Sequence, residues 1–244
     1  MNDPRTRLIV ALDLPDRRAV REALERLSGH VGYCKLGLEI FVREGPGLVE
    51  EILALGERVF LDLKLHDIPN TVAGAVRSAC RLGIHMLTLH ASGGQAMMEA
   101  ACGAAQAAPH PPLLLAVTAL TSLSPEDGRS IGVSAPIADW VVQLAGLARQ
   151  SGIRGLVASP LELPHLHSRF RGEMQLVIPG IRPAGASALD QARTAEPGQA
   201  IRSGADFIVV GRPILNAADP AAAADRVVAE IAAALAPRTG NSGN

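Results

Sequence analysis

Eight short apolar segments alternate with longer amphipathic or alanine-rich segments along this chain, and that alternation constrains the fold more than any other feature. The apolar segments have the composition of buried β-strands. The segments between them have helical patterns, with proline near several starts and glycine near several ends. The predicted strands span residues 7–13, 32–37, 58–64, 85–90, 112–118, 153–157, 175–178 and 206–210.

Eight successive βα units in 244 residues favour a single (β/α)8 barrel of the α/β class. A doubly wound open sheet is the rival architecture, and the strand count favours the barrel. No shift in composition marks a linker, so we expect one domain over residues 1–236 and a flexible tail at 237–244. Two long connections rich in turn-forming residues, at 119–136 and 179–198, are predicted to form an active-site lid and a phosphate-binding loop.

Polar residues recur at the C-terminal ends of the predicted strands, which is where (β/α)8 barrels place catalytic groups. In "VFLDLKLHDIPNT", the period of two in a strand puts Asp62 and Lys64 on one face and the flanking leucines on the other. We therefore expect Asp62 and Lys64 to point into the mouth of the barrel, and the leucines to face the helices. Further polar residues at strand ends are Asp13, Lys35, His90, Thr118 and Thr121.

The choice between lysine and arginine gives a sharper indication. Of the 23 basic residues, only Lys35 and Lys64 are lysine. A lysine ammonium can release a proton, whereas an arginine guanidinium effectively cannot. An isolated Asp-x-Lys pair is most simply a structural salt bridge. Two lysines and several carboxylates that converge at the catalytic end of a barrel instead favour proton transfer.

Composition argues against several classes of partner. The net charge is −1 and six residues in all are aromatic, so a nucleic-acid-binding surface is not expected. No apolar run reaches the roughly 18 residues that a membrane span requires, and the first residues lack the apolar segment of a signal peptide. The three cysteines lack metal or disulfide spacing. We expect a cytoplasmic protein with no cofactor, no bound metal and no membrane partner.

The motifs together resemble the orotidine 5'-phosphate decarboxylase family, whose members make UMP in pyrimidine biosynthesis. The signature "LDLKLHDIPNT" is similar to that of the family, and the resemblance extends over most of the chain. The other matching motifs, in order, are "IVALD" at 9–13, "CKLGLE" at 34–39, "TLHASGG" at 88–94, "VTALTS" at 117–122, "PGIRP" at 179–183, "DQARTAEP" at 190–197 and "VVGRPI" at 209–214.

This resemblance implies a cofactor-free decarboxylase that acts as a homodimer. It implies that Lys64 protonates C6 after carbon dioxide leaves, within a charged network that includes Asp62, Lys35 and Asp67. Asp67 and Thr71 would reach the partner subunit's site. Implied substrate contacts are those of Asp13 and Lys35 with the ribose, Thr121 with the pyrimidine, and Arg182, Gln191, Gly211 and Arg212 with the phosphate. His85 departs from the acidic residue expected at its position, but it lies at the start of a strand, far from the mouth.

Two alternatives remain open at this stage. A metal-dependent sugar-phosphate decarboxylase or aldolase of the same suprafamily would need a further acidic ligand on the second strand, for which Glu39 is a candidate. A barrel that binds nucleotides without catalysis is the other alternative. The presence of both lysines in a chain so rich in arginine argues against it.

Overall fold

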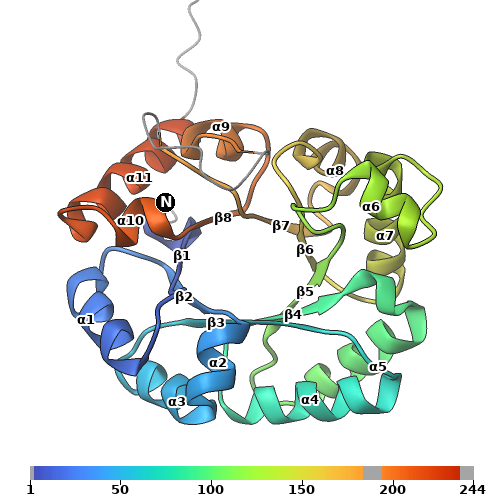
Figure 1. The fold of residues 1–244 in the computed structure, drawn as a ribbon, viewed down its shortest axis with the longest axis horizontal. Coiled ribbons are helices and arrows are strands. Elements are labelled where there is room, and N and C mark those ends of the chain that lie inside the picture. Colours follow the sequence, from blue (N-terminus) through green and yellow to red (C-terminus); the bar gives the residue numbers. More distant parts are fainter. Residues whose placement is uncertain (1–2, 184–193, 237–244) are drawn as a thin grey trace, which may run out of the picture.

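Eight parallel strands form a closed barrel in the order β1 to β8, and helices surround it (Figure 1). The computed structural model describes residues 3–183 and 194–236. The predicted (β/α)8 fold is therefore confirmed. The tail expected at 237–244 lies outside the described residues. Among residues 3–183 and 194–236, none of the helices combines the length and the hydrophobicity that a membrane span requires.

The strands are β1 (Leu8–Ala11), β2 (Tyr33–Leu36), β3 (Val59–Leu65), β4 (Met86–His90), β5 (Leu113–Val117), β6 (Gly155–Val157), β7 (Gln175–Ile178) and β8 (Phe207–Val210). The helices are α1 (Arg17–Leu27), α2 (Leu38–Glu44), α3 (Pro46–Ala54), α4 (Pro69–Arg81), α5 (Gln95–Gln106), α6 (Pro125–Ser130), α7 (Ile137–Gln150), α8 (Leu163–Phe170), α9 (Pro197–Arg202), α10 (Arg212–Leu215) and α11 (Pro220–Leu235). Short 3-10 turns, η1 (Pro4–Arg7) and η2 (Ala91–Gly93), precede β1 and follow β4.

Helix starts are specified by local sequence. The carboxylate of Asp16 accepts a hydrogen bond from the Ala19 backbone N–H at the start of α1, which satisfies a donor that the helix itself leaves unpaired. Ser124 and Asp127 form a reciprocal capping box at the start of α6. Several helices, including α4 and α11, begin at proline, whose fixed φ suits the first helical position.

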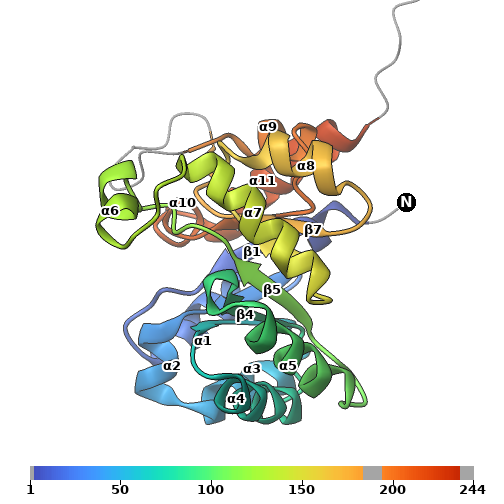
Figure 2. The same ribbon diagram turned by 90° about the vertical axis from the view of Figure 1, so that its right-hand side faces the viewer.

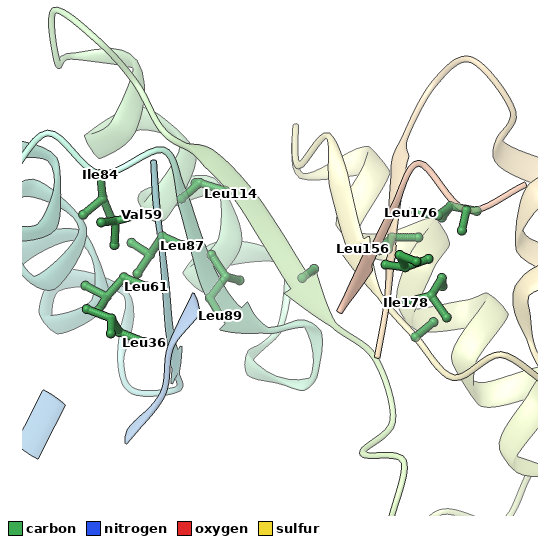
Figure 3. Close-up of a cluster of buried hydrophobic side chains, with 14 of the residues drawn as sticks. Leu36, Val59, Leu61, Ile84, Leu87, Leu89, Leu114, Leu156, Leu176 and Ile178 are labelled. Atoms are coloured by element: carbon green, nitrogen blue, oxygen red, sulfur yellow. The ribbon is translucent and has the colours of Figure 1, made fainter. Parts of the chain in front are cut away.

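Alternation along the strands divides the apolar residues into two layers. Outward-facing side chains from β2 to β7 pack against the helices, and Figure 3 labels Leu61 and Leu87 among them. Leu63 and Leu65 pack against the same layer, as their spacing predicts. A smaller cluster that includes Phe60, Met86 and other inward-facing residues fills the barrel interior. The interior is therefore a packed core that supports the mouth of the barrel from below.

Two aromatic rings, an imidazole ring and an arginine guanidinium group pack together at the N-terminal end of the barrel. The Tyr33 ring meets the ring of Phe207 edge-on, with centroids 5.7 Å apart, and meets that of His85 at 6.3 Å. Arg58 lies over the Tyr33 ring, 4.3 Å from its centroid. His85 thus lies at the end of the barrel opposite to the predicted site.

β3 is irregular where it carries the predicted catalytic residues. Its pairing with β4 shifts between Leu61 and Leu65, so the strand bulges there. Lys64 lies in this bulge with φ of +51°, and it is the one non-glycine residue with positive φ among those that the structure describes. Beyond the strands, α6 projects at one end of the molecule (Figure 2). It lies within the segment expected to form a lid.

Candidate active site

A cavity of about 280 Å³ opens at the C-terminal end of the barrel. Its walls come from β1, β2, β3, β6, β7 and β8 and from the segments that follow β1, β5, β7 and β8. The apolar part of the wall includes Phe60, Val157 and Val177, which belong to the interior layer or pack against it. Eight of the residues predicted from the sequence line the cavity: Asp13, Lys35, Asp62, Lys64, Thr121, Arg182, Gly211 and Arg212.

Asp62 is the centre of a row of alternating charges. Its Oδ2 atom lies 2.9 Å from Lys64 Nζ and 3.4 Å from Lys35 Nζ. Lys35 Nζ lies a further 3.3 Å from Oδ1 of Asp13. The structure therefore brings four of the predicted residues, Asp13, Lys35, Asp62 and Lys64, into one connected group.

The Asp62 side chain is 12% exposed, and its surroundings keep it ionised. Burial by itself would raise the pKa of this carboxyl group. The charges of Lys35 and Lys64 and the hydrogen bonds from Lys64 and Thr88 outweigh that effect and hold the pKa below its usual value. Asp62 is therefore a carboxylate at neutral pH, and its negative charge lies next to the amino groups of both lysines.

Sequence reasoning missed Thr88, which is fully buried on β4. The Thr88 hydroxyl donates to Asp62 Oδ1 over 2.9 Å and accepts a hydrogen bond from the Lys64 backbone N–H over 2.8 Å. The sequence feature that could have identified Thr88 is its hydroxyl within the otherwise apolar segment "HMLTLH". The period of two places it on the same strand face as Met86 and His90.

Asp67 and Thr71 are not among the residues that line the cavity of their own chain. Both are exposed, Asp67 after the end of β3 and Thr71 in the first turn of α4. The Asp67 carboxylate accepts a hydrogen bond from the backbone N–H of Ile68 over 2.6 Å. Gln191, the other predicted contact, lies outside the described residues.

Basic residues dominate the polar lining of the cavity. The cavity lining contains four basic side chains and two carboxylates, which carry a formal net charge of +2. These are Lys35, Lys64, Arg182, Arg212, Asp13 and Asp62. The arginines come from the segments after β7 and β8. The cavity is therefore electrostatically suited to a ligand that carries several negative charges.

Gly211 allows the backbone after β8 to pass close to β1. A Cβ atom at this position would lie 3.3 Å from Cβ of Ala11, tighter than most such contacts. A larger residue would displace the start of α10 and with it Arg212.

Two histidines lie beside the mouth. The rings of His66 and His90 are tilted against each other with centroids 5.4 Å apart, and His66 is exposed directly after the end of β3. Burial lowers the pKa of His90, and the neighbouring His66 and Lys64 lower it further, against the opposite influence of Asp62. A neutral His90 is therefore favoured in the folded protein.

Glu39 does not join the charged group. It lies exposed in the first turn of α2 and is not part of the cavity lining. Over residues 3–183 and 194–236, no group of three or more His, Cys, Asp or Glu side chains is arranged to hold a metal ion. The described geometry therefore offers no support for the metal ligand that the first alternative requires.

Comparisons with known proteins agree with this geometry. Residues 6–227 match the model of the Orotidine 5'-phosphate decarboxylase / HUMPS family. An orotidine 5'-phosphate decarboxylase from Opitutus terrae is 50% identical over 224 residues, which are 92% of this chain and 97% of the relative. One from Syntrophotalea carbinolica is 48% identical over 96% of this chain and 98% of its own length. The crystal structure of orotidine 5'-phosphate decarboxylase from Lactobacillus acidophilus superposes with a TM-score of 0.83 at 39% identity, covering 92% of this chain and 98% of that one.

Proposed function

The chain belongs to the orotidine 5'-phosphate decarboxylase / HUMPS family, and on that premise we propose how its cavity acts. The chain is a decarboxylase of pyrimidine biosynthesis that converts orotidine 5'-phosphate to UMP. The observation that carries the mechanism is the contact of Lys64 Nζ with Asp62 at the mouth of a positively charged cavity.

Lys64 is the proton donor in this proposal. When the bond between C6 and the carboxylate breaks, carbon dioxide leaves and the electron pair stays on C6. The Lys64 ammonium stabilises this developing negative charge and then transfers a proton to C6, which forms the C–H bond of UMP. The neutral amine that remains takes up a proton from water before the next turnover.

Asp62 has two roles in this account. It holds the Lys64 ammonium in position before the substrate arrives, because the two groups are 2.9 Å apart in a largely buried position. We place the substrate carboxylate beside Asp62, where the two negative charges repel each other. The departure of carbon dioxide relieves that repulsion.

The remaining cavity residues bind the parts of the substrate that do not react. We assign Asp13 and Lys35 to the ribose hydroxyls and Thr121 to the pyrimidine. We assign the phosphate to Arg182, Gly211 and Arg212, together with Gln191. Binding energy from the phosphate then contributes to orienting C6 against Lys64.

We further propose that the active unit is a homodimer, in which Asp67 and Thr71 enter the partner's site. Three observations support this arrangement. Both residues are exposed, neither lines the cavity of its own chain, and the adjacent Ile68 leaves an apolar side chain 67% exposed. A second copy of the chain would cover Ile68 while it receives Asp67.

We place the enzyme in the cytoplasm. Its thiols support this location, because Cys34, Cys80 and Cys102 are all free and burial raises the pKa of Cys34 to about 12. Unreactive free thiols are typical of a reducing compartment.

An absorbance assay with orotidine 5'-phosphate tests the proposed function. The purified protein should produce UMP at the same rate with and without EDTA. Loss of activity in EDTA that returns with a divalent metal would favour the metal-dependent alternative. Binding of UMP without any turnover of orotidine 5'-phosphate would favour the non-catalytic barrel.

A further inference from the structure

We propose that Thr88 is a positioning residue of the reaction, whose buried hydroxyl fixes Asp62 and Lys64 relative to each other. This inference rests on the roles proposed above for those two residues. It concerns a side chain that is not among those lining the cavity. Thr88 thus acts through its neighbours and not on the substrate.

The bulge in β3 creates the need for such a residue. Between Leu61 and Leu65, three residues of β3 lie opposite one residue of β4, and that residue is Thr88. The Lys64 backbone N–H donates to the Thr88 side chain over 2.8 Å. The hydroxyl therefore takes the place of a carbonyl acceptor at this point of the sheet, where the bulge interrupts the ladder.

The direction of each hydrogen bond follows from the chemistry of a hydroxyl group, which has one proton and two lone pairs. Since Thr88 accepts from the Lys64 backbone, its own proton is free to go to Asp62 Oδ1, 2.9 Å away. The other carboxylate oxygen of Asp62 receives the Lys64 ammonium at 2.9 Å. The three residues form a closed ring of hydrogen bonds that leaves neither carboxylate oxygen free to rotate.

The backbone of Lys64 depends on this ring. A left-handed φ of +51° is unfavourable for a residue with a Cβ atom and persists only where surrounding contacts hold it. Without the Thr88 hydroxyl, the Lys64 N–H loses its acceptor within the sheet. We expect Lys64 to relax toward an extended conformation, which moves its ammonium away from the position that protonates C6.

Replacing Thr88 with valine removes the hydroxyl and keeps the shape, whereas Thr88→Ser keeps the hydroxyl. A matched control is Thr118→Val, because Thr118 is also buried (2% exposed) and its hydroxyl donates to a backbone carbonyl, that of Val157, over 3.1 Å. We expect kcat of Thr88→Val to fall about 10- to 100-fold, the range that follows from small misplacement of a catalytic group, with KM little changed. Thr88→Ser and Thr118→Val should retain most of the wild-type kcat.

Two further measurements separate positioning from a loss of folding. Lys35 and Lys64 contact Asp62, His90 interacts with it electrostatically, and Asp13 contacts Lys35 in turn. Thr88→Val removes one of the hydrogen bonds that stabilise the charged form of Asp62. The acidic limb of the kcat profile should therefore move to higher pH in Thr88→Val and stay in place in Thr118→Val. The Lys64 backbone N–H should exchange with solvent deuterium faster in Thr88→Val than in the wild type, and its exchange should be unchanged in Thr118→Val.

Three outcomes would overturn the inference. The first is a Thr88→Val enzyme with wild-type kcat, acidic limb and Lys64 exchange. The second is a Thr88→Ser enzyme as slow as Thr88→Val, which would assign the effect to the methyl group. The third is a Thr118→Val enzyme that is equally slow. If the proposed function is wrong, the wild-type protein will not form UMP. If the proposed role of Lys64 is wrong, Lys64→Arg will keep full activity.

Discussion

Lys64 Nζ lies 2.9 Å from Asp62 Oδ2, although one residue separates the two along β3. On a regular strand, side chains two residues apart project in parallel at a spacing of about 6.6 Å. In this chain the strand bulges at Lys64 and the Lys64 backbone is left-handed, and there Lys64 Nζ and Asp62 Oδ2 lie closer than this spacing. The proposed proton donor and the carboxylate of Asp62 are thus in direct contact.

The first prediction concerns the phosphate contact. Arg212→Ala should lower kcat/KM for orotidine 5'-phosphate by roughly 10²- to 10⁴-fold, if two charge-assisted hydrogen bonds of about 1.5 to 3 kcal/mol each are lost. With the nucleoside orotidine, which has no phosphate, the variant and the wild type should converge. Steady-state kinetics on both substrates measures this difference.

Arg18→Ala is a suitable control for Arg212→Ala, because Arg18 is an exposed arginine that pairs with Glu22 on α1. It should leave both substrates unaffected. Equal impairment of Arg212→Ala on both substrates would mean that Arg212 does not act through the phosphate.

The second prediction tests whether two subunits share each site. Lys64→Ala and Asp67→Asn should each be inactive alone. If Asp67 acts in the partner's site, a mixed dimer has one site with both defects and one site with neither. Random reassortment of equal amounts makes about half of the dimers mixed, so about a quarter of the wild-type activity should return. Activity is measured after joint unfolding and refolding of the two variants.

The control for this experiment mixes Lys64→Ala with the double variant that carries both substitutions. No combination of those subunits restores an intact site, so that mixture should stay inactive. If tagged heterodimers of the two single variants form and remain inactive, Asp67 acts within its own chain.

The third prediction concerns stability against pH. The pKa of His90 is below its ordinary value in the folded protein, chiefly through burial. The unfolded chain therefore binds this proton more readily, and the unfolding free energy should fall as the pH drops below about 6.5 and through the folded pKa. Urea unfolding at several pH values between 7.5 and 5.5 measures this loss. His90→Gln, which cannot titrate, should show a smaller loss over the same range, and an unchanged loss would contradict the assignment.

The strand pattern was sufficient to predict the fold. The segment predicted at 175–178 coincides with β7, β3 lies one residue later than the predicted 58–64, and the other predicted strands contain the observed ones with differences of one or two residues at their ends. This agreement has a physical cause, since strands buried on both faces are continuous apolar runs with few polar interruptions. The inward direction of Asp62 and Lys64 followed from the same period of two.

Local alternation could not predict the bulge or the role of Thr88. A bulge changes how two strands pair, and that pairing depends on a residue 24 positions away along the chain from Lys64. The sequence pattern also placed Asp67 near Lys64 without indicating that it does not line the cavity of its own chain. Both features depend on the relation between separate elements or chains, which short-range patterns do not encode.

In the proposed mechanism Lys64 gives its proton to C6, and the decisive measurement is the turnover of Lys64→Arg. Arginine keeps the positive charge beside Asp62 but effectively cannot give up a proton. Purified Lys64→Arg should bind UMP, as measured by calorimetry, and should lose nearly all of its kcat with orotidine 5'-phosphate. A Lys64→Arg enzyme with near-normal kcat would contradict the assignment of Lys64 as the proton donor.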